Sequence, residues 1–293
     1  MAADGALAQF EAARPRLFGI AYRMLGTVAE AEDVVQEAWL RWQGADHAAV
    51  REPAAFLSTT VTRLALNELD SARARREQYI GPWLPEPVDT TADPALGAEK
   101  AEALSFAVLV LLEKLTPAER AAYVLHEAFA YPYRQIAEVL ETSEANARQL
   151  GSRARAHLAG SRTASVSAAE RDRLLAAFLA AAQSGDLEAL EAVLAGDILA
   201  LTDGGGAVTA ARKPVIGRAR VAPFLLGVVE KFLDGVEFAP AHYNGELAFV
   251  GYRDGTTMSV WTLDYGDDGI RGFYNVMNPA KLSRIGAVPG QSR

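Results

Sequence analysis

The chain has 293 residues, with 37 acidic against 29 basic side chains and no cysteine. At roughly 150 residues per domain, this length predicts about two domains. Half of the residues are hydrophobic, as in a globular protein. The lack of cysteine excludes a disulfide scaffold, a thiolate zinc site and a cysteine nucleophile, and it fits the reducing cytoplasm. The net charge of −8 excludes a strongly basic, autonomous DNA-binding protein.

Targeting segments are not visible in the sequence. The N-terminus has no basic stretch followed by an apolar one, so a signal peptide is not expected. No uncharged apolar run reaches the roughly 20 residues of a membrane helix. We therefore expect a cytoplasmic protein that does not bind a membrane.

The first 160 residues have helical periodicity with one interruption. We predict helices at 7–25, 28–43, 53–76, 97–114, 117–129, 133–140 and 143–159. Capping boxes at Thr27–Glu30 and Thr116–Glu119 mark two helix starts. The interruption, Gln78 to Pro94, contains four prolines and is predicted to be an extended linker.

The remainder of the chain combines helices with strands. A third capping box, Ser167–Glu170, begins a helix at 168–183, and further helices are predicted at 186–194 and 218–234. Three dipeptides, Asn244-Gly245, Asp254-Gly255 and Asp268-Gly269, are typical of tight hairpins with positive φ at both residues. They predict a four-stranded antiparallel meander, curved around helices, in an α+β domain with room for a pocket.

The strongest local motif is the segment Tyr133 to Leu158. A short helix, a three-residue turn at 141–143 and a second helix with arginines on its polar face are typical of a helix-turn-helix. An ordinary pair of helices in an alanine-rich protein is the alternative. The candidate DNA contacts are Asn146, Arg148, Gln149, Ser152, Arg153 and Arg155. Arg148 is the candidate for a base contact, and Arg153 and Arg155 are the candidates for phosphates.

Two earlier helices carry polar stripes. On helix 28–43 the stripe consists of Asp33, Gln36, Glu37 and Arg41, and on helix 53–76 it consists of Arg63, Asn67, Asp70 and Arg73. Each set recurs at spacings of three or four residues, which places its members on one face. A face exposed only to solvent is the alternative interpretation of either stripe.

Together and in this order, the three motifs resemble a bacterial RNA polymerase sigma factor of the extracytoplasmic-function type. AEDVVQEAWLRW is similar to the part of region 2 that docks on the polymerase clamp. PAAFLSTTVTRLALNELDSARARR is similar to the part that melts and reads the −10 element, and the segment from Leu115 to Leu158 is similar to region 4, which reads the −35 element. The resemblance implies two all-α domains, region 2 at 1–77 and region 4 at 97–160, joined by the linker 78–96.

The resemblance also assigns residues to partners. The implied contacts with core polymerase are Asp33, Gln36, Glu37, Leu40 and Arg41. The implied −10 contacts are Arg63, Asn67, Asp70 and Arg73, with His47 and Arg51 in a loop that could hold a flipped base. The expected partners are the clamp and flap of core polymerase and promoter DNA.

After a linker at 161–167, residues 168–283 resemble a SnoaL-like domain of the cone-shaped NTF2-like folds, and 284–293 form a tail. A sigma-factor subgroup carries such a domain together with short motifs. Here these are Trp83-Leu84-Pro85-Glu86-Pro87, Asp203-Gly204-Gly205-Gly206 and Asn278-Pro279-Ala280-Lys281-Leu282. Ala207 and Ala280 replace the Lys and Asp that are usual in the family. We expect the first motif to contact the other two and the C-terminal domain to regulate the sigma regions in cis.

Two alternatives differ in class from a sigma factor. SnoaL-like folds include polyketide cyclases and isomerases, for which the candidate residues are Asp203, His242, Asp264 and Asn275. The domain could also hold an unknown small ligand. A conventional repressor would instead bind a palindrome as a dimer through the helix-turn-helix alone. We expect no catalytic residue, no cofactor and no metal.

Overall fold

A computed structural model describes residues 2–89, 105–159 and 166–285. The chain forms two compact units. The helical unit contains residues 1–78 and 88–161, and the sheet unit contains 79–87 and 162–293. Residues 79–87 lie in the first third of the chain, yet they belong with the C-terminal domain. The predicted fold class, helical sigma-type regions followed by an α+β domain, is confirmed.

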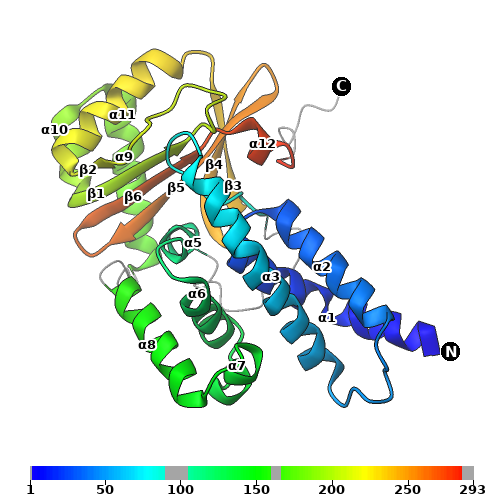
Figure 1. The fold of residues 1–293 in the computed structure, drawn as a ribbon. Coiled ribbons are helices and arrows are strands. Elements are labelled where there is room, and N and C mark those ends of the chain that lie inside the picture. The colour runs from blue at the N-terminus through cyan, green and yellow to red at the C-terminus, as the bar shows by residue number, and fades with distance from the viewer. Residues whose placement is uncertain (1, 90–104, 160–165, 286–293) are drawn as a thin grey trace. The chain divides into compact units, whose positions relative to one another are not determined.

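The helical unit contains both sets of sigma-like motifs. Its elements are α1 (Ala2–Leu25), α2 (Val28–Gln43), α3 (Pro53–Glu77), α5 (Phe106–Leu112), α6 (Pro117–Tyr123), a π-helical turn (Val124–Ala128), α7 (Tyr133–Val139) and α8 (Glu144–Ala159) (Figure 1). One hydrophobic core joins all of these helices. Arg16 of α1 crosses between the two sets, because it donates to the carbonyl oxygen of Phe129 at 2.9 Å and lies over the Phe129 and Tyr131 rings.

Helix starts follow the predicted capping boxes in part. At Thr116 the box is complete, with the hydroxyl accepting from the Glu119 amide and the Glu119 side chain accepting from Thr116. At Thr27 the helix start is as predicted, but the capping box does not form, because the hydroxyl caps no backbone amide and donates to the Glu30 carboxylate at 2.7 Å. Glu30 also pairs with Arg75 of α3, which draws its carboxylate away from the helix start.

Two predicted segments differ from the structure or extend beyond its described part. Of the predicted helix 97–114, residues 97–104 lie outside the described residues, and α5 begins after the Ser105 cap. The predicted helix 117–129 changes to a π-helical turn after Tyr123. The linker is described as far as Asp89.

The sheet unit contains helices α9 (Ala168–Ser184), α10 (Leu187–Val193), α11 (Arg218–Phe232) and α12 (Pro279–Leu282). Its strands are β1 (Leu194–Asp203), β2 (Val215–Ile216), β3 (Glu237–Tyr243), β4 (Glu246–Arg253), β5 (Thr256–Gly266) and β6 (Gly269–Val276). The sheet order is β2-β1-β6-β5-β4-β3. The antiparallel meander β3 to β6 is as predicted, and β1 extends it by pairing parallel to β6.

Two of the three predicted hairpin turns are confirmed. Asn244-Gly245 and Asp254-Gly255 have positive φ at both residues, as a type I′ turn requires. The third hairpin also forms, since β5 pairs antiparallel with β6, but its turn residues are Asp267 and Asp268, because Gly269 already begins β6 and Asp268 does not have positive φ. A Cβ on Gly269 would lie 2.7 Å from the Val193 carbonyl oxygen, so this glycine permits the close approach of a neighbouring backbone.

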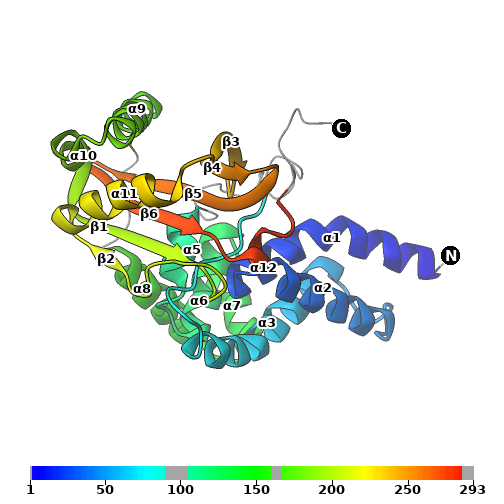
Figure 2. The ribbon, with the colours of Figure 1, turned by 90° about the horizontal axis from the view of Figure 1, so that it is seen from above.

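Aromatic side chains fill the core of the sheet unit. Trp261 of β5 stacks on Phe249 of β4 with ring centroids 4.4 Å apart, and Phe273 and Phe178 lie at 5.8 and 6.1 Å. Helices α9, α10 and α11 pack with β1, β5 and β6 around this core, and they are grouped beside the sheet in Figure 2. The aromatic rings therefore form much of the core between these helices and the sheet.

Candidate functional site

Helix α8 presents the residues predicted to contact the −35 element. Ala147, Leu150 and Ala154 are buried against the rest of the helical unit. The opposite face exposes Arg148, Gln149, Ser152 and Arg153, while Asn146 and Arg155 are partly exposed. The Asn146 amide donates to the Thr142 hydroxyl at 2.8 Å, so it braces the turn that precedes α8.

The arginines of α8 are engaged in intramolecular pairs. Arg148 pairs with Glu144 one helical turn earlier, and Arg153 lies 3.3 Å from Glu119. Arg155 pairs with Glu127 at 2.9 Å and donates to the Tyr133 hydroxyl at 3.0 Å. These two hydrogen bonds raise the pKa of Arg155, that to Glu127 most.

Tyr133 supports α8 in a way that the sequence analysis missed. Its ring lies under the Arg148 guanidinium, 5.3 Å from the ring centre, and stacks on His126. A Cβ at Gly151 would lie 2.8 Å from the Tyr133 hydroxyl, so the glycine makes room for it. The glycine within the helix was the signal that could have indicated a close neighbour.

Helix α2 separates its polar stripe from the core. Val34, Val35, Ala38 and Trp42 are buried. The predicted polymerase contacts, Asp33, Gln36, Glu37, Leu40 and Arg41, are all exposed. Leu40 is unusual for an apolar residue because 55% of it is accessible, and Arg41 pairs with Glu37 at 3.0 Å beside it. The face is thus mixed, with an apolar side chain among charges.

The predicted −10 residues fall into three groups. Asn67, Asp70 and Arg73 are exposed on α3. Arg63, on the same helix, donates to the carbonyl oxygens of Glu138 and Val139 at 2.9 and 3.1 Å and pairs with Glu141. It therefore caps the C-terminal end of α7.

The third group lies in the connection between α2 and α3. Arg51 is exposed, whereas the His47 ring rests edge-on against Trp42 and its Nε2 lies 2.8 Å from the Trp42 carbonyl oxygen. His47 is thus held by the helix that precedes the loop, and only Arg51 of the pair is fully available at the surface.

The sheet unit contains a buried polar cluster centred on Asp203, at the end of β1. The Asp203 carboxylate accepts four hydrogen bonds and is fully buried. The donors are the Tyr79 hydroxyl at 2.6 Å, the Leu84 amide at 2.9 Å, the Lys281 ammonium at 2.7 Å and the Gly205 amide at 3.1 Å. We call Tyr79, Leu84, Asp203, Asn278 and Lys281 the clasp.

Lys281 joins the three motifs of the clasp. Its ammonium group donates to the Leu84 carbonyl oxygen as well as to Asp203. It also lies over the Trp83 ring, 4.1 Å from the centre, and over the Tyr79 ring at 5.1 Å. A buried ammonium flanked by a carboxylate, a carbonyl and two aromatic faces has its charge compensated on several sides.

Asn278 completes the clasp from the last segment. Its amide donates to the Tyr79 hydroxyl at 2.7 Å, and its side-chain oxygen caps α12 through the Ala280 amide. Burial, and then the hydrogen bond to Asp203, raise the pKa of Tyr79. Tyr79 therefore stays neutral and keeps its proton for Asp203.

The glycines after Asp203 allow the clasp to close. A Cβ at Gly205 would lie 2.4 Å from the Asn278 amide, and one at Gly206 would lie 2.9 Å from Ile80. Both residues also have positive φ. Ala207 and Ala280, which depart from the family pattern, take part through their backbone amides, which donate to Gly204 and Asn278. Those contacts do not need the missing charges.

Sequence reasoning found part of the clasp. Trp83, Leu84, Asp203, Asn278 and Lys281 were candidates and share these contacts, while Pro85, Gly204, Pro279 and Leu282 flank them. Tyr79 and Ile80 were missed because they precede the recognisable motif. The large side chains of Tyr79 and Ile80, directly before Gly81, were the available signal.

The four residues considered for catalysis are dispersed over the sheet. Asp203 is held in the clasp, while His242 is exposed on β3. The sheet order places β1 and β3 four strand spacings apart, roughly 19 Å along the sheet. Asp264 is partly exposed on β5, and Asn275 is buried on β6. A His–Asp pair of the kind used by cone-fold enzymes is therefore not formed by Asp203 and His242.

Within residues 2–89, 105–159 and 166–285, no helix has the length and apolar character required to cross a membrane. The same ranges contain no group of three or more His, Cys, Asp or Glu side chains arranged to hold a metal ion.

Comparisons with known proteins agree with the order of the motifs. Residues 9–75 match the family model "Sigma-70 region 2", and residues 105–158 match "Sigma-70, region 4". The chain is 39% identical to the ECF RNA polymerase sigma factor SigJ of Mycobacterium tuberculosis, over 94% of this chain and 93% of that protein. It is 36% identical to the probable ECF sigma factor SigI of the same species, over 76% and 77%.

The likeness extends to a solved structure. The crystal structure of the M. tuberculosis extracytoplasmic function sigma factor SigJ matches with a TM-score of 0.76 and 36% identity. The match covers 94% of this chain and 98% of the other, so it includes the C-terminal domain as well as the two helical regions.

The ion pair in the clasp generates the first prediction. We expect Lys281→Met to lower the free energy of unfolding by about 3–5 kcal/mol, because Asp203 stays buried without its cation. The double variant Asp203→Asn/Lys281→Met should lose less than the sum of the single variants, with a coupling of about 0.5–3 kcal/mol. Urea unfolding of the full-length protein measures this cycle. Lys213→Met, at an exposed lysine, is the control, and additive losses in the cycle would contradict the prediction.

Proposed function

Because the chain belongs to the extracytoplasmic-function RNA polymerase sigma factors, which bind core polymerase and promoter DNA, we propose a division of labour among its elements. Helix α2 supplies the main contact with the polymerase clamp, and region 4 approaches the flap. Helices α3 and α8 contact the −10 and −35 elements, and the C-terminal domain regulates transcription initiation in cis. The observation that carries the proposal is the ordered match to regions 2 and 4 together with similarity along nearly the whole chain.

The surface of α8 supports its role at the −35 element. A recognition helix reaches base edges through the residues of its first turns, here Arg148 and Gln149, and phosphates through later ones. The pairs of Arg148 with Glu144 and of Arg155 with Glu127 are partly exposed, so their exchange for DNA partners costs little.

The surface of α2 supports a protein partner. An exposed leucine flanked by the Glu37–Arg41 pair combines apolar area with directional charges, as interface centres do. Helix α3 offers a purely polar edge at Asn67, Asp70 and Arg73, which suits the phosphates and polar base edges of a melted strand.

The chain path supports regulation in cis. Residues 79–87 follow directly on α3 and precede region 4, and the clasp binds them to the C-terminal domain. While they are held, these nine residues cannot extend, which limits how far regions 2 and 4 can separate if their shared core opens. Release would add about 30 Å of extended chain. A signal that opened the clasp would thereby change promoter use without altering any residue that reads DNA.

The enzyme and ligand alternatives receive less support. Asp203, the candidate base, already accepts four hydrogen bonds, including one from an ammonium group. These four donors already occupy the carboxylate oxygens that a general base would need for its substrate. We propose that the domain works through protein contacts, in the cytoplasm where RNA polymerase acts.

The proposed polymerase surface gives the second prediction. We expect the double reversal Glu37→Lys/Arg41→Glu to weaken binding to core polymerase by 10-fold or more, because one charged hydrogen bond is worth about 1.5–3 kcal/mol. The same reversal of the exposed Glu170–Arg173 pair in α9 is the matched control. Binding is measured by titration with labelled core enzyme. Unchanged affinity of the α2 variant would show that core polymerase binds elsewhere on the protein.

The third prediction separates base reading from phosphate binding on α8. Arg148→Ala should cost about 1–3 kcal/mol on the preferred −35 sequence and relax sequence choice. Arg155→Ala should weaken all sequences alike and reduce the salt slope by about 1. Holoenzyme binding to a panel of −35 variants at several salt concentrations measures both. Equal, sequence-independent effects would refute the division.

Regulation in cis gives the fourth prediction. Trp83→Ala removes the ring over the Lys281 ammonium and should loosen residues 79–87 from the C-terminal domain. We expect a larger radius of gyration in solution scattering together with altered promoter-directed transcription. Phe232→Ala, at an exposed aromatic of the same unit, is the control. The proposal fails if Trp83→Ala leaves both the scattering and the transcription as in the wild type.

A further inference from the structure

A cluster of arginines lies where α3 meets the connection from α5 to α6. Glu113, at the end of α5, accepts from Arg76 of α3 and from Arg120 of α6, the latter at 2.5 Å. Only 12% of the Arg76 side chain and 3% of the Arg120 side chain are exposed. Two guanidinium groups therefore share one carboxylate in a nearly dry environment.

Positive charge exceeds negative charge in this cluster. Burial lowers the pKa of Arg76, Glu113 opposes that effect, and the nearby charge of Arg120 lowers the pKa further. Arg73 adds a third guanidinium at the same place, because it lines one pocket together with Arg120 and Glu113. The cluster thus carries three guanidinium groups against the carboxylates of Glu113 and Glu30.

One hydrogen-bond donor in this cluster is unused. The Nε of Arg120 donates to the Arg23 carbonyl oxygen at 3.0 Å and Nη1 donates to Glu113. Its Nη2 is buried and has no hydrogen-bond partner among the described residues. A charged, buried donor without an acceptor is unfavourable, so an acceptor is expected beside it.

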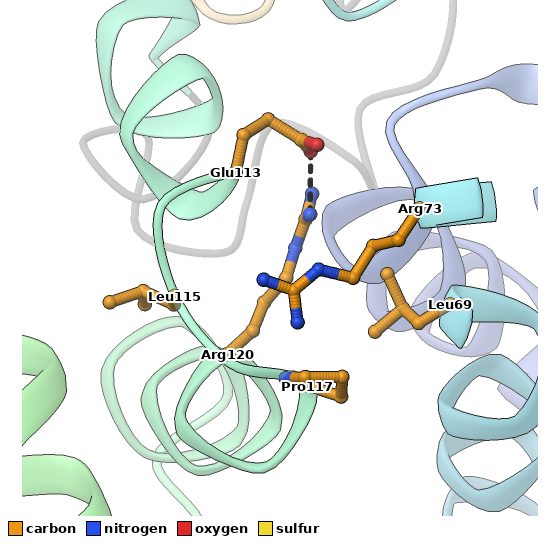
Figure 3. Close-up of a pocket in the computed structure, with 6 residues that line it drawn as sticks. All are labelled: Leu69, Arg73, Glu113, Leu115, Pro117 and Arg120. Carbon is orange, nitrogen blue, oxygen red and sulfur yellow. Dashed lines mark hydrogen bonds and ion pairs between the residues drawn. The ribbon is translucent and has the colours of Figure 1, made fainter. Parts of the chain in front are cut away.

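A pocket lies beside the Arg120 side chain. It is lined by Leu69, Arg73, Glu113, Leu115, Pro117 and Arg120. Figure 3 shows Arg73 extending from α3 toward the side of the pocket that Arg120 and Pro117 form. The space at its base fits a group about the size of a water molecule, such as one oxygen of a larger anion.

We propose that this pocket binds an oxyanion of the phosphate class. One anion oxygen accepts from the free Nη2 of Arg120, and Arg73 contacts the part of the anion at the mouth. Guanidinium groups bind phosphate through charge-assisted hydrogen bonds, which suits this pair. The anion has two possible sources, a free phosphate compound and the backbone of promoter DNA. The site goes beyond promoter reading, because a free anion would occupy it without DNA.

The test measures binding of inorganic phosphate and pyrophosphate to the full-length protein by calorimetry, at constant ionic strength. Arg73→Gln, at an exposed side chain that lines the pocket, should weaken binding 10- to 100-fold, the effect of one lost charged hydrogen bond. Arg220→Gln removes the same charge from an exposed position of the sheet unit and should leave affinity unchanged. Absence of binding, or equal losses in the two variants, would overturn the proposal.

A second variant tests the sign of the electrostatics. Glu113→Gln removes the acid of the pocket, so phosphate should bind several-fold more tightly even if the variant is less stable. A merely structural role of the cluster predicts no gain in affinity, and weaker binding would count against the site.

A further experiment adds core polymerase and promoter DNA at saturation. Displacement of phosphate identifies the DNA backbone as the source, and unchanged phosphate affinity identifies a free anion.

Discussion

The Asp203 carboxylate organises the sheet unit, because a fully buried charge must be compensated wherever the chain can supply donors. Two of its four donors, Tyr79 and Leu84, come from the first third of the chain, and Lys281 comes from α12. A buried ion pair adds little net stability over an apolar replacement, but breaking one partner is costly. The main effect of the clasp is therefore on conformational specificity rather than on net stability. It selects which segment lies on the C-terminal domain.

As a result, the two compact units of the structure do not coincide with the domains that the sequence motifs define. Regions 2 and 4 share one hydrophobic core and contacts such as that from Arg120 to the Arg23 carbonyl oxygen. The linker between them belongs in part to the other unit. Each unit is thus discontinuous in sequence, and the chain crosses between them three times, near residues 78, 87 and 161.

Local patterns predicted much of this fold, and long-range contacts account for what they missed. The bounds of α2 match the prediction because its buried residues follow the helical period and Gly44 ends it. The parallel pairing of β1 with β6 joins residues some seventy positions apart, which no local pattern encodes. The ion pairs of Glu113 and the ring of Tyr133 beneath Arg148 were invisible for the same reason. The family resemblance indicated the segments around Leu84, Asp203 and Lys281, and their regulatory role stays a proposal.

The discontinuity of the sheet unit also has a consequence for biosynthesis. Leu84 leaves the ribosome 119 residues before Asp203, and its carbonyl oxygen meets Lys281 only 197 residues later. At about 5–20 residues per second, Asp203 is synthesised roughly 6–24 s after Leu84, and Lys281 is synthesised about 10–40 s after Leu84. During that interval regions 2 and 4 can complete their shared core while Trp83 and Leu84 have no place to bury. A nascent chain can thus fold its sigma regions before the clasp exists, and the clasp is completed only when α12 has been made.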